Sequence, residues 1–90
     1  MYETLDRVKA NRIVKVVDFV VPKHHIHIPQ YIVRLQEMGV LKGEIIEVRR
    51  NTGIGPIEIN VKGTKLAIGR GIASRIIVEE VNEQWKHKFS

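Results

Sequence analysis

The chain has 90 residues, 43% of them hydrophobic, and a formal net charge of +5. It is therefore expected to form one small domain, because chains below about 100 residues rarely build a second core. It contains no cysteine, which excludes a disulfide framework, a thiolate zinc site, an iron–sulfur cluster and a cysteine nucleophile. No stretch reaches the roughly 18–20 apolar residues of a membrane helix, and the N-terminus lacks a signal-peptide core. We expect a cytoplasmic domain without membrane insertion.

The basic residues are dispersed along the chain rather than gathered in a run. Arg49 and Arg50 form the only adjacent pair. The net positive charge of the chain can attract nucleic acid, acidic protein surfaces or anionic lipid. Because no run of five to eight Lys or Arg residues occurs, we expect a solvated surface of mixed charge.

The first predicted element is a strand over residues 12–21, where β-branched and apolar residues run almost without a break. Pro22 and Pro29 then bracket a short segment, and an extended loop is expected there because proline lacks the N–H that a helix or sheet interior requires. After Pro29, apolar residues recur at helical spacing as far as Gly39. This spacing predicts one helix over residues 30–38.

Four further strands follow the helix. The clearest shows strict alternation of Ile57, Ile59 and Val61 with polar residues, the pattern of a strand with one buried face. Lys62 and Gly63 then predict a tight hairpin, and segments rich in turn formers predict the other connections. The four strands are expected over residues 44–50, 57–61, 65–68 and 75–81, with turns over 51–56 and 69–74.

Links this short cannot build a doubly wound parallel sheet, whose crossovers need a dozen or more residues each. We therefore expect a mainly β fold, a small SH3-like antiparallel β-barrel of about five strands with one short α-helix. An OB-type barrel is the nearest alternative. The barrel domain is expected over residues 1–81, and residues 82–90 form a C-terminal tail. There, Trp85 and Phe89 can cap the barrel or anchor another protein.

Groups for catalysis are scarce. A dinucleotide fingerprint needs a third glycine that Gly53-Ile54-Gly55 and Gly69-Arg70-Gly71 lack, and no phosphate-binding loop occurs. A hydrolytic triad is not expected either. The available serines and aspartates, none of them beside a histidine in sequence, are Ser74, Ser90, Asp6 and Asp18. The sequence therefore predicts a protein that is not an enzyme and requires no cofactor.

His24, His25 and His27 form the one cluster with metal-coordination chemistry. In an extended segment His25 and His27 point to the same side, so two imidazoles can share a divalent metal, with further ligands needed from elsewhere. We favour exposed loop histidines that bind a metal such as zinc adventitiously. The alternative is a physiological role in sensing or handing over a metal, which would be iron.

The apolar face of the predicted helix is expected to pack on the core of its own domain rather than on a partner. Strand alternation places Arg49 and Arg50 on opposite faces, where a solvated pair is expected. The helix residues concerned are Tyr31, Ile32, Leu35 and Met38.

An ordered series of short motifs follows Pro29. Residues 34–43, Arg-Leu-Gln-Glu-Met-Gly-Val-Leu-Lys-Gly, match a helix that ends in Leu-x-x-Met/Leu-Gly and is followed by an apolar pair and x-Gly. Together with an opening Thr-Leu-Asp-Arg-Val-Lys at residues 4–9, this order resembles the FeoA family over about residues 4–81. The later matching motifs lie at residues 46–50, 55–59, 61–63, 66–68 and 77–79.

Three positions depart from the family pattern. Asn11 stands where the family usually has a glycine, and residues 22–29 replace a link rich in glycine and arginine. The third departure is Gly53-Ile54-Gly55-Pro56, which replaces a Leu-Gly-Asp-Pro loop. All three lie in loops, so the expected fold is unchanged.

The resemblance implies a cytoplasmic SH3-like accessory domain for ferrous iron uptake. It would act by contact with FeoB, the membrane-embedded ferrous iron transporter, through that transporter's cytoplasmic GTPase region. The resemblance also extends to domains at the C-terminus of metal-dependent repressors, but we do not expect a helix-turn-helix before this one. The alternative is a small basic barrel that binds RNA or DNA, which the few aromatic residues disfavour. The sequence leaves a weak homodimer open.

A domain without catalytic groups must act by contact, and recognition commonly resides in loops on a rigid barrel. The expected surface lies where the end of the helix and the turn loops meet, near residues 39–43 and 51–55. Arg50 and Ile54 are the candidate partner-binding residues of this surface, with Gly53 and Gly55 shaping the loop. A charge can steer docking, and a loop isoleucine can fill a pocket. Two alternatives stay open: Ile54 can tuck under its own loop, and Arg50 can be merely solvated.

Overall fold

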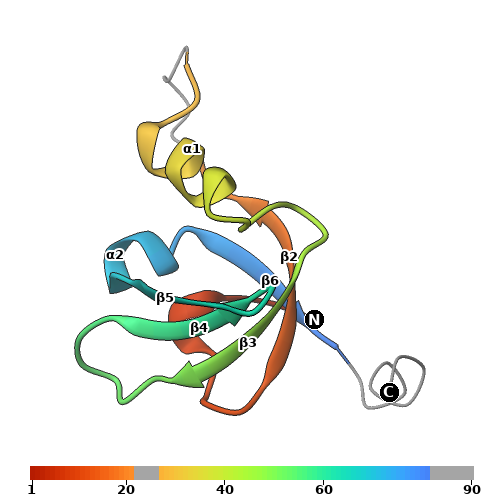
Figure 1. Ribbon diagram of the computed structural model, residues 1–90, viewed down its shortest axis with the longest axis vertical. Coiled ribbons are helices and arrows are strands. Elements are labelled where there is room, and N and C mark those ends of the chain that lie inside the picture. The colour runs from red at the N-terminus through yellow and green to blue at the C-terminus, as the bar shows by residue number, and fades with distance from the viewer. Residues whose placement is uncertain (22–26, 82–90) are drawn as a thin grey trace.

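In the part of the chain that the structure describes, six strands form one antiparallel sheet that curls into a small barrel (Figure 1). The computed structural model describes residues 1–21 and 27–81. The strands lie in the order β1-β6-β2-β3-β4-β5, so β1 and β5 are the edges of the sheet. In chain order the elements are β1 (Tyr2–Thr4), the 3₁₀ turn η1 (Leu5–Arg7), β2 (Ile13–Phe19), α1 (Gln30–Glu37), β3 (Ile45–Arg50), β4 (Ile57–Val61), β5 (Thr64–Ile68), α2 (Arg70–Ala73) and β6 (Ile76–Glu80).

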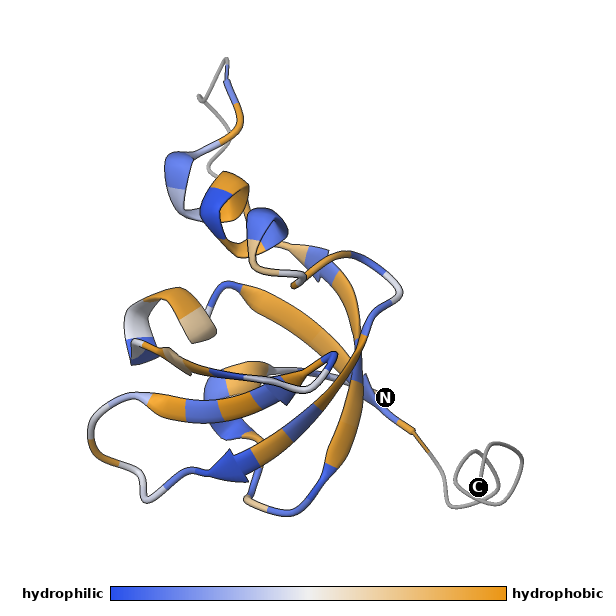
Figure 2. Ribbon diagram, in the orientation of Figure 1, coloured by the Kyte–Doolittle hydropathy of each residue, from blue (hydrophilic) through white to orange (hydrophobic). Residues whose placement is uncertain are grey.

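Alternation along the strands decides which side chains reach the core. In β4, Ile57, Ile59 and Val61 are buried while Glu58 is exposed, and Figure 2 shows hydrophobic and hydrophilic positions alternating along the strands. This pattern confirms the predicted mainly β fold. The buried apolar residues are Leu5, Val8, Val14, Val16, Phe19, Ile32, Leu35, Val40, Ile46, Val48, Ile57, Ile59, Val61, Ile68, Ala73, Ile76 and Val78.

The connection between β4 and β5 is the predicted two-residue hairpin. Val61 pairs with Thr64 across the turn, and Lys62 and Gly63 have φ of 51° and 79°. Positive φ at both central residues is the geometry whose twist matches that of the flanking strands. The hairpin therefore fixes the register of the β5 edge.

Helix α1 occupies nearly the predicted residues, and it sits over one end of the barrel (Figure 1). Ile32 and Leu35 are buried as expected, but Met38 is 45% exposed. The expectation for Met38 is wrong because it is the C-cap residue, just beyond the helix, where its side chain leaves the packed face. Tyr31 is partly buried, and its hydroxyl donates a hydrogen bond to Val20 O at 2.9 Å.

Three elements were not predicted: β1, η1 and α2. β1 has only three residues and depends on pairing with the distant β6, where Tyr2 lies opposite Glu79. The barrel therefore has one strand more than expected. Residues 69–74, expected as a turn, contain the single helical turn α2, in which Ala73 N donates to Gly69 O at 2.9 Å. The burial of Ala73 supports this turn.

Asn11 explains one departure from the FeoA pattern. Its φ is 72°, in the left-handed region, and its N–H donates to Val48 O at 2.7 Å. Asparagine is among the few residues other than glycine that enter this region readily. The turn before β2 therefore keeps the backbone conformation that a glycine would favour.

Among residues 1–21 and 27–81, no helix is long and apolar enough to cross a bilayer. Trp85 and Phe89 lie outside the described residues. Their packing on the barrel stays a prediction.

Candidate functional site

The loop between β3 and β4, residues 51–56, projects from the barrel away from α1 (Figure 1). The expectation that this loop meets residues 39–43 is therefore wrong, because Gly39 lies beside Val61 and Lys62 at the other end of β4. Ile54 near its tip is 85% exposed, so it does not tuck under its own loop. Gly53 and Gly55 on either side have φ of 89° and 78°. These left-handed conformations strongly favour glycine. The two glycines thus turn the chain so that an apolar side chain stands in solvent.

Arg50, the last residue of β3, lies close to this loop. Its side chain is 70% exposed, and its Nε lies 3.7 Å from Oε2 of Glu58 on β4. An ion pair this exposed contributes little to stability. The guanidinium can therefore leave Glu58 and pair with a carboxylate of another protein at a small cost in free energy.

Arg49 is exposed as well, and its Nη1 lies 3.2 Å from Glu47 Oε1. The expectation that Arg49 and Arg50 face opposite sides of the strand is wrong. The register between β3 and β4 shifts between Val48 and Arg50, and such an irregularity redirects the side chains that follow it. Both arginines therefore lie on the solvent side.

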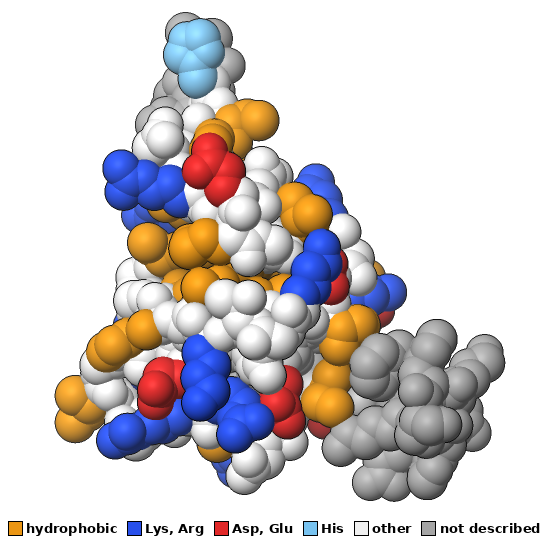
Figure 3. Space-filling model, viewed as in Figure 1, with side chains coloured by type: hydrophobic (Ala, Val, Ile, Leu, Met, Phe, Trp, Pro, Cys, Tyr) orange, Lys and Arg blue, Asp and Glu red, His pale blue; other side chains and the backbone are white. Residues whose placement is uncertain are grey.

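A shallow hollow of about 390 Å³ lies over the outer face of β3, β4 and β5 beside Arg50. Arg49, Glu58 and Lys65 also line it. On the face shown in Figure 3, basic and acidic side chains intermingle below the centre, with hydrophobic side chains at the left edge. Arg50 lines the hollow and directly precedes the 51–56 loop, so the charged hollow adjoins the loop that carries Ile54.

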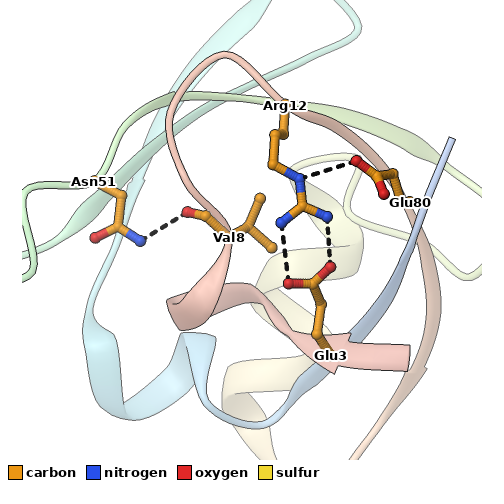
Figure 4. A network of polar contacts seen from close by, with 5 residues as sticks. All are labelled: Glu3, Val8, Arg12, Asn51 and Glu80. Atoms are coloured by element: carbon orange, nitrogen blue, oxygen red, sulfur yellow. Dashed lines mark hydrogen bonds and ion pairs between the residues drawn. The ribbon is translucent and has the colours of Figure 1, made fainter. Parts of the chain in front are cut away.

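Two residues that sequence reasoning missed hold this loop. Asn51 Nδ2 donates to Asp6 O at 2.9 Å and to Val8 O at 2.8 Å, the second of which Figure 4 shows. Arg70 Nη1 donates to Asn51 Oδ1 at 2.8 Å. Arg70 stands between two glycines in a segment expected to be a plain turn, and no local pattern links it to Asn51. Only the fold brings the two together.

A second polar network ties the N-terminal edge of the sheet together (Figure 4). Arg12 donates through Nη1 and Nη2 to the carboxylate of Glu3, at 3.1 and 2.6 Å, and its Nε lies 3.3 Å from Glu80 Oε1. The hydrogen bonds to Glu3 are the main cause that raises the pKa of Arg12. This network joins β1 and β6 to Arg12, the residue directly before β2, and we assign it a structural role.

The predicted metal cluster is only partly described. His24 and His25 lie outside the described residues, and His27 is exposed in a bend. Within residues 1–21 and 27–81 there is no group of three or more His, Cys, Asp or Glu residues that could hold a metal ion. The histidine cluster therefore stays a prediction.

The family model of the FeoA domain matches residues 3–80, which is most of the chain. The chain belongs to the FeoA domain family. A curated relative, "Putative Fe(2+) transport protein A" of Methanocaldococcus jannaschii, is 47% identical over 47 residues, which cover 52% of this chain and 56% of the relative. The chain thus matches little more than half the length of that relative.

Solved structures of FeoA proteins share the fold. An "Iron Uptake Regulatory Protein (FeoA)" superimposes with a TM-score of 0.76 at 28% identity, covering 90% of this chain and 99% of that one. A FeoA-like protein from Clostridium acetobutylicum gives 0.72 at 25% identity, covering 91% and 90%. A manganese-dependent transcriptional repressor gives 0.74 at 15% identity, covering 89% of this chain and 42% of that one. At that identity the last likeness concerns the fold alone.

Proposed function

We propose that this FeoA-family chain is a non-catalytic accessory protein of ferrous iron transport. It acts in the cytoplasm by contact with the GTPase region of a FeoB-type membrane transporter. The family, the Fe(2+) transport name of the relative and the iron-uptake name of the structural neighbour support the transport role. The transporter as partner comes from the family resemblance.

The exposed Ile54 is the observation that carries the mode of action. Ile54 is 85% exposed and lies on a loop that Asn51 already holds, so its side chain contributes little to the stability of the fold. Burial in a partner's pocket would instead remove its apolar surface from water, which is favourable. Arg50 beside it can pair with an acidic group at the rim of that pocket, which assists docking more than it adds affinity.

Contact of this kind regulates a GTPase only if the accessory protein binds one state of the enzyme more tightly than another. Couplings between two binding sites typically amount to about 1–3 kcal/mol. The chain can therefore change GTP hydrolysis or transport several-fold without contributing a catalytic group.

The test is an NMR titration of the ¹⁵N-labelled chain with the isolated cytoplasmic region of the FeoB-type transporter from the same organism. We expect chemical-shift changes at residues 49–58 and Lys65, and little change along α1. Shifts confined to α1, or no shifts at all, would contradict the proposed surface. Binding of RNA or DNA in place of the transporter, with a steep loss of affinity in salt, would support the alternative function.

A further inference from the structure

Packing does not hold the tip of the 51–56 loop. A Cβ added to Gly53 or Gly55 would meet no atom within 4 Å, so both glycines lie in open space. Glycine also loses more backbone freedom on ordering than any other residue. The conformation that exposes Ile54 must therefore depend on polar contacts. One lies within the tip, where Thr52 Oγ1 donates to Ile54 O at 3.0 Å, and the others lie at the base of the loop.

Arg70, the first residue of α2, makes several of those contacts. Its Nη1 donates to Asn51 Oδ1 at 2.8 Å and, less strongly, to Gly55 O at 3.4 Å. Its Nη2 donates to Asp6 O at 2.8 Å. The planar guanidinium therefore joins both ends of the loop to η1, which a point charge such as Lys cannot reproduce.

The amide of Asn51 completes the arrangement. Its Nδ2 donates to the carbonyls of Asp6 and Val8, while Oδ1 accepts both from Arg70 and from Gly53 N, the latter at 3.1 Å. With donors and acceptor all engaged, the Asn51 side chain has one favourable orientation. Arg70 fixes that orientation by donating to Asn51 Oδ1, and the same oxygen then holds the amide of Gly53.

We propose that Arg70 is a positioning residue, whose guanidinium keeps the 51–56 loop in the conformation that presents Ile54 to the partner. This inference rests on the proposed function. Ordering the loop before the encounter lowers the entropy cost of binding. Arg70 therefore raises affinity through the geometry of Ile54, without needing to touch the partner.

The test compares Arg70→Lys with Arg7→Lys, a matched control at an exposed position in η1. Both substitutions keep the charge, so long-range steering is preserved. We expect Arg70→Lys to weaken binding of the transporter's cytoplasmic region by roughly five- to tenfold in calorimetry, because charge-assisted hydrogen bonds are lost. The control should bind like the parent.

Two further readouts separate positioning from a general loss of stability. Backbone order parameters of Gly53, Ile54 and Gly55 should fall in Arg70→Lys from about 0.85 toward 0.6, while those of β4 stay unchanged. In an Ile54→Ala background, Arg70→Lys should have little further effect on affinity, because a residue that acts through Ile54 gives a non-additive double-mutant cycle.

The inference is overturned if Arg70→Lys binds the transporter region with parental affinity. It is also overturned if the effects of Arg70→Lys and Ile54→Ala on affinity are additive, or if order parameters fall across the whole barrel. Its failure is distinct from failure of the proposed function. If the parent chain does not bind the transporter region, the proposed function is wrong. The order parameters then decide the positioning role alone, and an unchanged loop in Arg70→Lys overturns it.

Discussion

Ile59 lies directly opposite Val48 in the register of β3 and β4, and both side chains are fully buried. This pair sits at the centre of the barrel wall. An unpaired carboxylate here would lose its hydration, at a cost of several kcal/mol. That cost is comparable to the whole stability of a small domain, which is about 5–10 kcal/mol.

We therefore expect Ile59→Asp to unfold the chain at ambient temperature. Glu58→Asp, at the adjacent exposed position of the same strand, is the matched control and should leave the thermal transition within a few degrees of the parent. Circular dichroism melting of both variants tests this. A cooperative transition at the parental temperature in Ile59→Asp would mean that β4 does not face the core as described.

The turn before β2 allows a test of the left-handed backbone at Asn11, where φ is 72°. Asn11→Gly should change the free energy of unfolding by less than about 0.5 kcal/mol, because glycine adopts this region freely but gains entropy in the unfolded chain. Asn11→Val should lower it by about 1–2 kcal/mol. Urea unfolding measures both. Equal effects of Asn11→Val and Lys9→Val, the latter at an exposed neighbouring position, would contradict the assignment.

The lowered pKa of Asp18 predicts that the folded chain loses a small part of its stability in acid. Its carboxylate lies 3.0 Å from Lys42 Nζ and accepts a hydrogen bond from Phe19 N. Lys42, and then the Phe19 amide, hold the pKa of Asp18 below its ordinary value of 3.8. A carboxyl group with a lowered pKa stabilises the folded state above its unfolded pKa, and this contribution disappears as the pH falls through the folded pKa.

The parent should accordingly melt slightly higher than Asp18→Asn at neutral pH, and the two should converge in strong acid. The difference should be modest because both side chains are more than half exposed. Thermal melts of the two proteins as a function of pH test this. A gap that stays constant down to the lowest pH would show that ionisation of Asp18 is not its cause.

If the histidines between Pro22 and Pro29 bind metal, their removal should lower the affinity of the chain for divalent ions. A variant in which His24, His25 and His27 are all replaced by Ala should lose most of its affinity for divalent ions in calorimetry, because neutral imidazole is the ligand that such ions would use. Under the adventitious interpretation that we favour, the same variant still binds the transporter region with parental affinity. Metal affinity retained by the triple variant would remove the cluster as a site.

The main strands and the helix could be predicted because their patterns are local. Ile57, Ile59 and Val61 alternate with polar residues, and Ile32 and Leu35 repeat at helical spacing, so each pattern carries its own structure. β1 could not be predicted, since three residues form a strand only when β6 lies beside them. Likewise, the exposure of Arg49 follows from a register shift against β4 that no local pattern encodes.

The candidate site divides in the same way. Ile54 could be proposed from the sequence, because turn formers mark its segment as a loop and a loop isoleucine can fill a partner's pocket. The residues that hold the loop could not be predicted, since tertiary structure brings Asp6, Asn51 and Arg70 together. Asn51 and Arg70 both donate to the backbone carbonyl of Asp6. Such acceptors leave no trace in side-chain composition.

In the proposed function, the Ile54 loop and Arg50 form the surface that binds the transporter. Its most direct test is the affinity of the double variant Ile54→Asp with Arg50→Glu for the cytoplasmic region, measured by calorimetry. The control is Ile28→Asp with Arg34→Glu, which makes the same charge change at an exposed Ile and Arg in and before α1.

Both double variants should melt close to the parent, because all four side chains are exposed. We predict that the loop variant loses at least about tenfold in affinity, since burying a carboxylate in an apolar pocket is unfavourable, while the control loses at most a few-fold. Equal losses in the two variants, or parental affinity in the loop variant, would show that Ile54 and Arg50 do not form the binding surface.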